Sequence, residues 1–143
     1  MPNDEPPLYS ERVSSGLPPL DELIDGLRLG DNVVWQVEDL DDYRRFSEAF
    51  LEQSRRDKRS FIYVRFGTHP PVLEPGPGQR IETVDPRDGF DVFSAQVNRI
   101  IAHWGERAFY VFDNLSCLVD LWATDELVAN FFQATCPYLF DLS

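Results

Sequence analysis

The segment AFYVFD, residues 108–113, is apolar on both faces until its last residue. A strand with one face in water alternates apolar and polar side chains, whereas a strand covered on both faces is a continuous apolar run. The segment therefore predicts a central strand of a parallel sheet with helices on both sides. Asp113 is expected at the carboxyl end of that strand.

The rest of the chain alternates between strand-like and helix-like patterns. The expected strands are 32–37, 60–66 and a short extended piece at 80–84, and the expected helices are 20–27, 40–56, 90–104 and one that ends before Pro137. This alternation indicates βαβ units, and hence a three-layer α/β fold with a mostly parallel sheet. Such sheets bind ligands at the carboxyl ends of their strands. The segments 38–42, 67–71 and 113–116 are therefore the places to search for a site.

Charge and motif content exclude several classes of function. Asp and Glu number 25 against 13 Lys and Arg, a net charge of −12, which repels nucleic acid and anionic membranes. No apolar run is long enough to span a bilayer and no signal peptide is recognisable, which predicts a cytosolic protein. Cys117 and Cys136 stand apart without a metal-ligand or redox spacing, so neither a metal nor another cofactor is expected. Residues 1–11 are expected to be a flexible arm, and 12–143 a single domain.

Three segments, in order, resemble the RecA-like ATPases of the KaiC type. VSSGLPPLDELIDGLRLGDNVVW is similar to the opening of that family, FIYVRF falls where its second strand lies, and FYVFDNLS is similar to its Walker B strand. The resemblance covers about Arg12 to Ser116. It implies a RecA-like core in which Asp113 holds the Walker B position and the segment after 32–37 holds the phosphate-binding loop.

The phosphate-binding loop itself departs from the family pattern. A P-loop needs glycines, a lysine and a Ser or Thr so that backbone N–H groups, an ammonium and a hydroxyl can hold phosphates and Mg²⁺. Residues 38–45 read EDLDDYRR, with acidic residues at Glu38, Asp39, Asp41 and Asp42. The catalytic glutamates that the family carries after its second strand are also replaced, by Gly67 and Thr68. We therefore expect a degenerate site that does not bind ATP and has no catalytic residue.

The acidic stretch has a physical rationale without any ligand. A helix N-terminus presents unpaired N–H groups and a positive dipole end, which a carboxylate satisfies as well as a phosphate does. We predict that Asp39, or Asp41 nearby, caps the helix and fills the former anion site from within. A plain solvated acidic surface and a metal site are the alternatives.

The same segments, together with FFQATCPYLFDL, also resemble the N-terminal region of some prokaryotic proteins related to phosphoenolpyruvate synthase and pyruvate phosphate dikinase. That resemblance implies an accessory domain whose phosphotransfer chemistry lies in a further C-terminal part. The ending of the chain, an apolar run after a helix, is interpreted as a RecA-like domain truncated at its C-terminus, with a sheet edge for a partner to cover.

Three functions follow as hypotheses. The first is a regulatory or protein-interaction module that has lost ATP binding, with a protein partner or self-association. The second is a binding domain or enzyme for a small phosphorylated or acidic metabolite, held at the strand ends by Arg65, His69 or Arg80. The third, a hexameric motor, needs an ATP site. Arg65 discriminates between the first two, because a buried and unpaired arginine calls for an anion, whereas one paired with Asp113 or Glu38 is structural.

Overall fold

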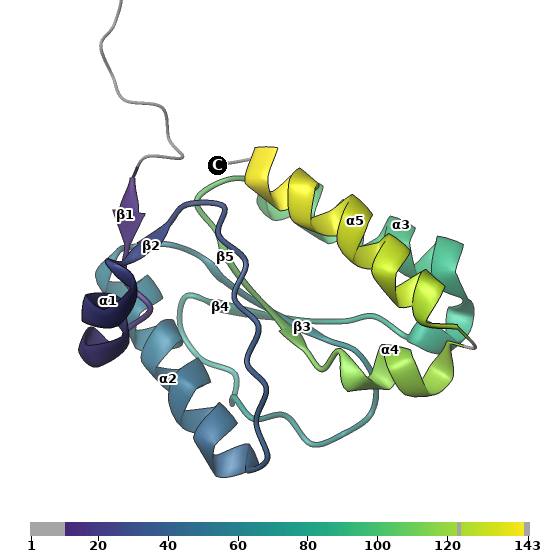
Figure 1. The fold of residues 1–143 in the computed structure, drawn as a ribbon, viewed down its shortest axis with the longest axis horizontal. Helices are drawn as coiled ribbons and strands as arrows, with labels where there is room; N and C mark the ends of the chain where they lie inside the picture. The colour runs from purple at the N-terminus through teal and green to yellow at the C-terminus, as the bar shows by residue number, and fades with distance from the viewer. Residues whose placement is uncertain (1–10, 123, 142–143) are drawn as a thin grey trace, which may run out of the picture.

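The centre of the fold is a parallel sheet of three strands, seen in a computed structural model that describes residues 11–122 and 124–141 (Figure 1). The strands are β3 (Phe61–Arg65), β4 (Gln79–Thr83) and β5 (Phe109–Asp113), in the order β4-β3-β5. Arg65 lies beside Thr83 and Asp113 in the register, so these three residues mark the carboxyl edge of the sheet. The predicted α/β fold with a parallel sheet is confirmed.

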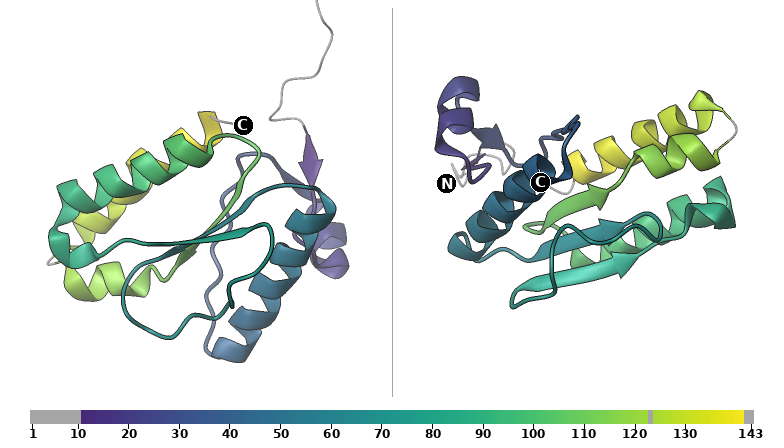
Figure 2. Two further views of the ribbon diagram at one scale, coloured as in Figure 1. Left: turned by 180° about the vertical axis from the view of Figure 1, so that it is seen from behind. Right: turned by 90° about the horizontal axis from the view of Figure 1, so that it is seen from below.

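Helices flank the sheet (Figure 2). They are α1 (Pro18–Ile24), α2 (Leu40–Arg56), the 3-10 turn η2 (Pro86–Asp88), α3 (Phe90–Trp104), α4 (Ser116–Leu121) and α5 (Asp125–Asp141). Two short strands, β1 (Arg12–Val13) and β2 (Leu27–Arg28), pair antiparallel around α1. The predicted helices 40–56 and 90–104 are confirmed at both ends.

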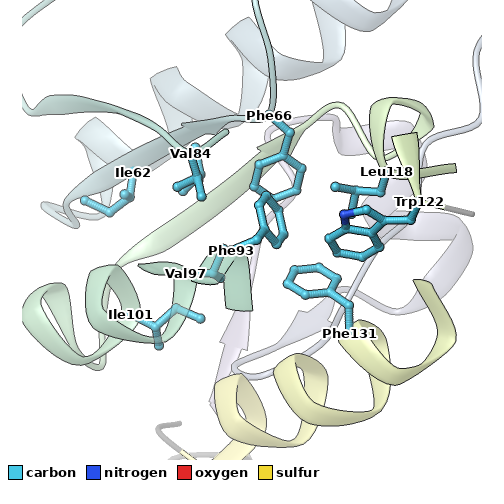
Figure 3. Packing of buried hydrophobic residues seen from close by; sticks show 10 residues of the cluster. Ile62, Phe66, Val84, Phe93, Val97, Ile101, Leu118, Trp122 and Phe131 are labelled. Carbon is cyan, nitrogen blue, oxygen red and sulfur yellow. The ribbon is translucent and has the colours of Figure 1, made fainter. Parts of the chain in front are cut away.

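The side-chain alternation of β3 divides the core between the two faces of the sheet. Phe61 and Tyr63 pack with α2, in a cluster that includes Leu51. Ile62, Val64 and Phe66 pack on the opposite face with residues of α3, α4 and α5 (Figure 3). All five of these side chains, four from β3 and that of Phe66 just after it, are fully buried. Burial on both faces is what a continuous apolar strand predicts.

The turn before α1 is fixed by Gly16 and Asp21. Gly16 has φ +86°, and a Cβ atom there would lie 2.2 Å from the carbonyl oxygen of Ala49 in α2, so the backbones approach too closely for any side chain. The Asp21 carboxylate accepts hydrogen bonds from the Ser15 backbone N–H at 2.9 Å and hydroxyl at 2.7 Å, and from the Ser14 hydroxyl. The Ser-Ser-Gly turn therefore sets the position of α1 against α2.

The predicted strand 32–37 is not paired into the sheet of this structure. This segment is extended but forms no ladder, and Val33, Val34 and Trp35 are 48%, 67% and 40% exposed. Its β-branched composition favours a strand, yet a strand also needs a neighbour to which it donates and from which it accepts hydrogen bonds. In the described residues the sheet ends at β5.

Three further details differ from the sequence prediction. The last helix, α5, does not end before Pro137 but continues through it to Asp141. Helix α4 follows β5 directly and was not expected. The apolar residues of α1 do not form a buried face, since Leu23 is 82% exposed. Of the predicted arm 1–11, residues 1–10 lie outside the described residues.

Candidate functional site

The carboxyl edge of the sheet carries a buried polar cluster around Asp113. The Asp113 side chain is 2% exposed and accepts a hydrogen bond from the Tyr63 hydroxyl, which itself accepts one from the backbone N–H of Val72 at 3.2 Å. His69 Nε2 lies 3.0 Å from Asp113 Oδ2, although its geometry is not that of a hydrogen bond. Asp113 therefore organises the sheet edge and the loop that follows β3.

Two tyrosines keep their protons beside this carboxylate. Burial, followed by the negative charge of Asp113, raises the pKa of Tyr43 far above its ordinary range. Burial and the hydrogen bond to Asp113 do the same to the pKa of Tyr63. Both phenols are thus neutral donors at physiological pH. The two phenols therefore take part in this cluster as hydrogen-bonding groups.

Arg65 and His69 lie together at this edge. An Nη2 of Arg65 donates to the backbone carbonyl of His69, while Arg65 Nε and both ring nitrogens of His69 are buried without a hydrogen-bond partner among the described residues. Arg65 is thus paired with neither Asp113 nor Glu38. Unsatisfied buried donors at a strand end are an opportunity for a small acceptor ligand.

Arg80 lies apart from this pair. It stands beside Ile62 in the register, on the face of the sheet opposite Tyr63, and its guanidinium lies 5.6 Å from the centre of the Trp104 ring. The structure therefore brings Arg65 and His69 together and separates both from Arg80. The three cannot hold one small ligand jointly.

The N-terminus of α2 is capped from within the chain. Asp39 is the N-cap residue, and its Oδ1 accepts a hydrogen bond from the backbone N–H of Asp41 at 2.8 Å. Asp41 and Asp42 add two more carboxylates in the first turn. The predicted capping role of Asp39 is confirmed. Carboxylates here complement the helix dipole, and they place negative charge where a phosphate would have to approach.

Replacing Asp39 with alanine is expected to lower the free energy of unfolding by about 1 kcal/mol, because the cap hydrogen bond is lost. Asp42→Ala is the matched control, since it removes the same charge from the first turn of α2 but no cap. Urea unfolding followed by circular dichroism measures both. Equal losses in the two variants would show that only the charge near the dipole contributes.

Cys117, in α4 shortly after β5, is a further neighbour of this edge. A Cβ atom on Gly67 would lie 3.3 Å from Cys117 Sγ and 3.7 Å from His69 Nδ1, so the thiol and the imidazole flank Gly67. Burial, and then the charges of Asp113 and Asp120, raise the pKa of the Cys117 thiol. A protonated thiol is a weak nucleophile, so the arrangement does not favour covalent catalysis.

A large cavity of about 900 Å³ adjoins this cluster. It lies among the extended segment 31–37, β5, α2 and α5, and its walls are mostly apolar. His69 and Asp113 line it at one end, next to the loop after β3. The sequence did not predict this cavity, because the segment that forms one of its walls, 32–37, was expected to be a strand of the sheet.

Within the part of the chain that the structure describes, no three His, Cys, Asp or Glu side chains are grouped so as to hold a metal ion. Among the described helices, none combines the length and apolarity needed to cross a bilayer. Comparison with models of known protein families and with curated proteins finds no match to this chain.

Proposed function

We propose that the chain is a RecA-like domain that has lost its nucleotide site and works as a regulatory or protein-interaction module. The observation that carries the proposal is the N-terminus of α2, where the phosphate of a nucleotide would be bound. Asp39 already caps this terminus, and Asp41 and Asp42 occupy its first turn. A polyphosphate would meet unfavourable charge at the place where it needs donors.

The Walker B-like aspartate supports the same proposal. A magnesium-binding carboxylate needs free lone pairs and a second oxygen ligand. Asp113 is buried, accepts a hydrogen bond from Tyr63 and contacts His69. Its role in the proposal is to tie the loop after β3 to the sheet.

Exposed apolar side chains favour an interaction role over a catalytic one. Val119 and Leu121 on α4 are 53% and 51% exposed, and Leu40 at the start of α2 is 67% exposed. Exposed apolar groups gathered on short elements commonly mark protein interfaces. In the proposal the partner is another protein or a second copy of the chain, in the cytosol, and the domain is accessory to a phosphoenolpyruvate or pyruvate phosphotransferase.

A thermal-shift series with ATP, ADP and AMP, each with and without Mg²⁺, tests the loss of nucleotide binding. A ligand that binds only the native state stabilises it by mass action and so raises the melting temperature. At a ligand concentration of a hundred times Kd, the free energy of unfolding rises by about 2.7 kcal/mol. We expect no shift with any of the three nucleotides. A Mg²⁺-dependent shift with ATP would overturn the proposal.

A second candidate function rests on Arg65 Nε and the two ring nitrogens of His69, which are buried without a hydrogen-bond partner among the described residues. These groups would suit a small phosphorylated or carboxylic metabolite, with phosphoenolpyruvate as the probe. A Mg²⁺-independent shift with this probe that is lost in Arg65→Gln and retained in Arg80→Gln would favour metabolite binding. Arg80→Gln is the matched control because Arg80 lies on the other face of the sheet.

A further inference from the structure

The outer edge of β5 presents backbone groups that have no strand to pair with. Phe109 N–H donates to Ser60 and the Asp113 carbonyl accepts from Phe66, so the groups of these β5 residues point toward β3. Residues of a parallel strand direct their backbone groups alternately to the two sides. The N–H and C=O of Tyr110 and Phe112 therefore point to the outer edge, where no strand of residues 11–122 or 124–141 pairs.

The segment 32–37 runs along this edge at a distance. Figure 1 shows it passing beside β5 in the same direction, from the end of β2 to the start of α2. The cavity of about 900 Å³ lies between them, lined by Val33, Val34 and Val37 on one side and by Val111 and Phe112 on the other. The space is partly open to solvent and its walls are mostly apolar, so water in it contacts apolar side chains of both segments, which favours their closer approach.

The chemistry of the segment suits a strand at this edge. It is rich in β-branched residues, it is as long as β5, and its direction matches the parallel sheet. One face is already anchored, since the Trp35 ring stacks on Phe46 of α2 with 4.3 Å between ring centres. By alternation Val34 points away from Trp35, toward the side of the sheet where α5 lies.

We infer that residues 32–37 close onto β5 as a fourth parallel strand, which gives the order β4-β3-β5-(32–37). Closure gives hydrogen-bond partners to the outward groups of Tyr110 and Phe112 and removes exposed apolar surface at Val33 and Val34. An apolar ligand in the cavity would cover the side chains but could not satisfy those backbone groups. The inference does not depend on the proposed function, because closure concerns only the sheet edge.

Residue-resolved hydrogen exchange of the full chain tests the inference. We expect every second amide between residues 32 and 37, together with those of Tyr110 and Phe112, to exchange about tenfold or more slowly than an unstructured amide. The amides of Ile62 and Val64 in the central strand serve as an internal reference for the intact fold. Fast exchange at all amides of 32–37, with the β3 reference still protected, would overturn the inference.

A pair of substitutions gives an independent test. Val34 is 67% exposed and Val92, on α3, is 46% exposed, so the structure as it stands predicts that an aspartate is tolerated at both positions. If the segment closes, Val34→Asp buries a carboxylate against α5 and lowers the melting temperature by about 5 °C or more, whereas Val92→Asp does not. Val34→Asp should also remove the protection of Tyr110 and Phe112. Equal melting temperatures for the two variants would contradict closure.

Discussion

Replacing Phe66 with alanine is expected to lower the free energy of unfolding by about 3–5 kcal/mol. Phe66 follows β3, is fully buried, and its ring lies 4.8 Å from that of Phe93, 5.7 Å from that of Phe112 and 6.1 Å from that of Phe131. These partners come from α3, β5 and α5, and Figure 3 shows Phe66 together with Phe93 and Phe131. Truncation thus leaves a cavity where three elements meet, and rigid neighbours on each side limit its collapse.

Urea unfolding of the full chain measures this effect, with Leu23→Ala as the control. Leu23 also has a large apolar side chain and lies in α1, but it is 82% exposed, so its truncation should change stability by less than about 0.5 kcal/mol. A loss below about 1 kcal/mol for Phe66→Ala would mean that the aromatic cluster on this face is not packed as described.

Replacing Asp113 with alanine is expected to cost about 3 kcal/mol, because the buried Tyr63 hydroxyl loses its acceptor and the space left beside Tyr63 and His69 is not refilled. The direction of the change distinguishes two roles for this residue. A carboxylate kept for ligand or metal chemistry commonly costs stability, so that its removal stabilises the fold. A carboxylate that organises a structural network has the opposite effect.

Asp120→Ala is the matched control, since Asp120 lies on α4 near the same strand end but is exposed. Its removal should leave stability within about 0.5 kcal/mol of the wild type. Thermal and urea unfolding of both variants, with Tyr63→Phe to complete a double-mutant cycle, measure the coupling. A more stable Asp113→Ala protein would favour a functional role for this carboxylate.

Most of the fold was predictable from side-chain periodicity. Phe90, Phe93, Val97 and Ile101 recur at helical spacing and lie in α3. The apolar run of β5 correctly indicated a strand, but the predicted central position is wrong, because β3 is the central strand and β5 lies at the edge of the described sheet with its three middle residues only partly buried. The cap at Asp39 was also predictable, because a carboxylate before an amphipathic helix has a direct physical partner in the N–H groups of the first turn.

The errors arose where tertiary contacts decide. Residues 32–37 have the composition of a strand, but composition does not provide a neighbouring edge, and the described sheet ends at β5. Pro137 suggested a helix end, because an interior proline removes a hydrogen bond and its ring crowds the preceding turn. Helix α5 nevertheless continues to Asp141, and Tyr138 and Leu139 beyond the proline pack against the core cluster.

The candidate site was only half visible in the sequence. Asp113, Arg65 and His69 were identified because they follow strands, and the structure places them at one edge. Tyr43 and Tyr63 were not identified, because nothing in a linear pattern shows that a phenol in α2 and one in β3 converge on the same carboxylate. Arg80 was grouped with the others because its face of the sheet could not be determined before the register was known.

The division of the core by β3 has a consequence for cooperativity. The same strand supplies Phe61 and Tyr63 to the α2 cluster and Ile62, Val64 and Phe66 to the other cluster. If one cluster unfolded alone, β3 would lose the packing contacts on one face while it kept its hydrogen bonds with β4 and β5. The two core clusters are therefore coupled through β3, and a substitution that destabilises one cluster should also destabilise the other.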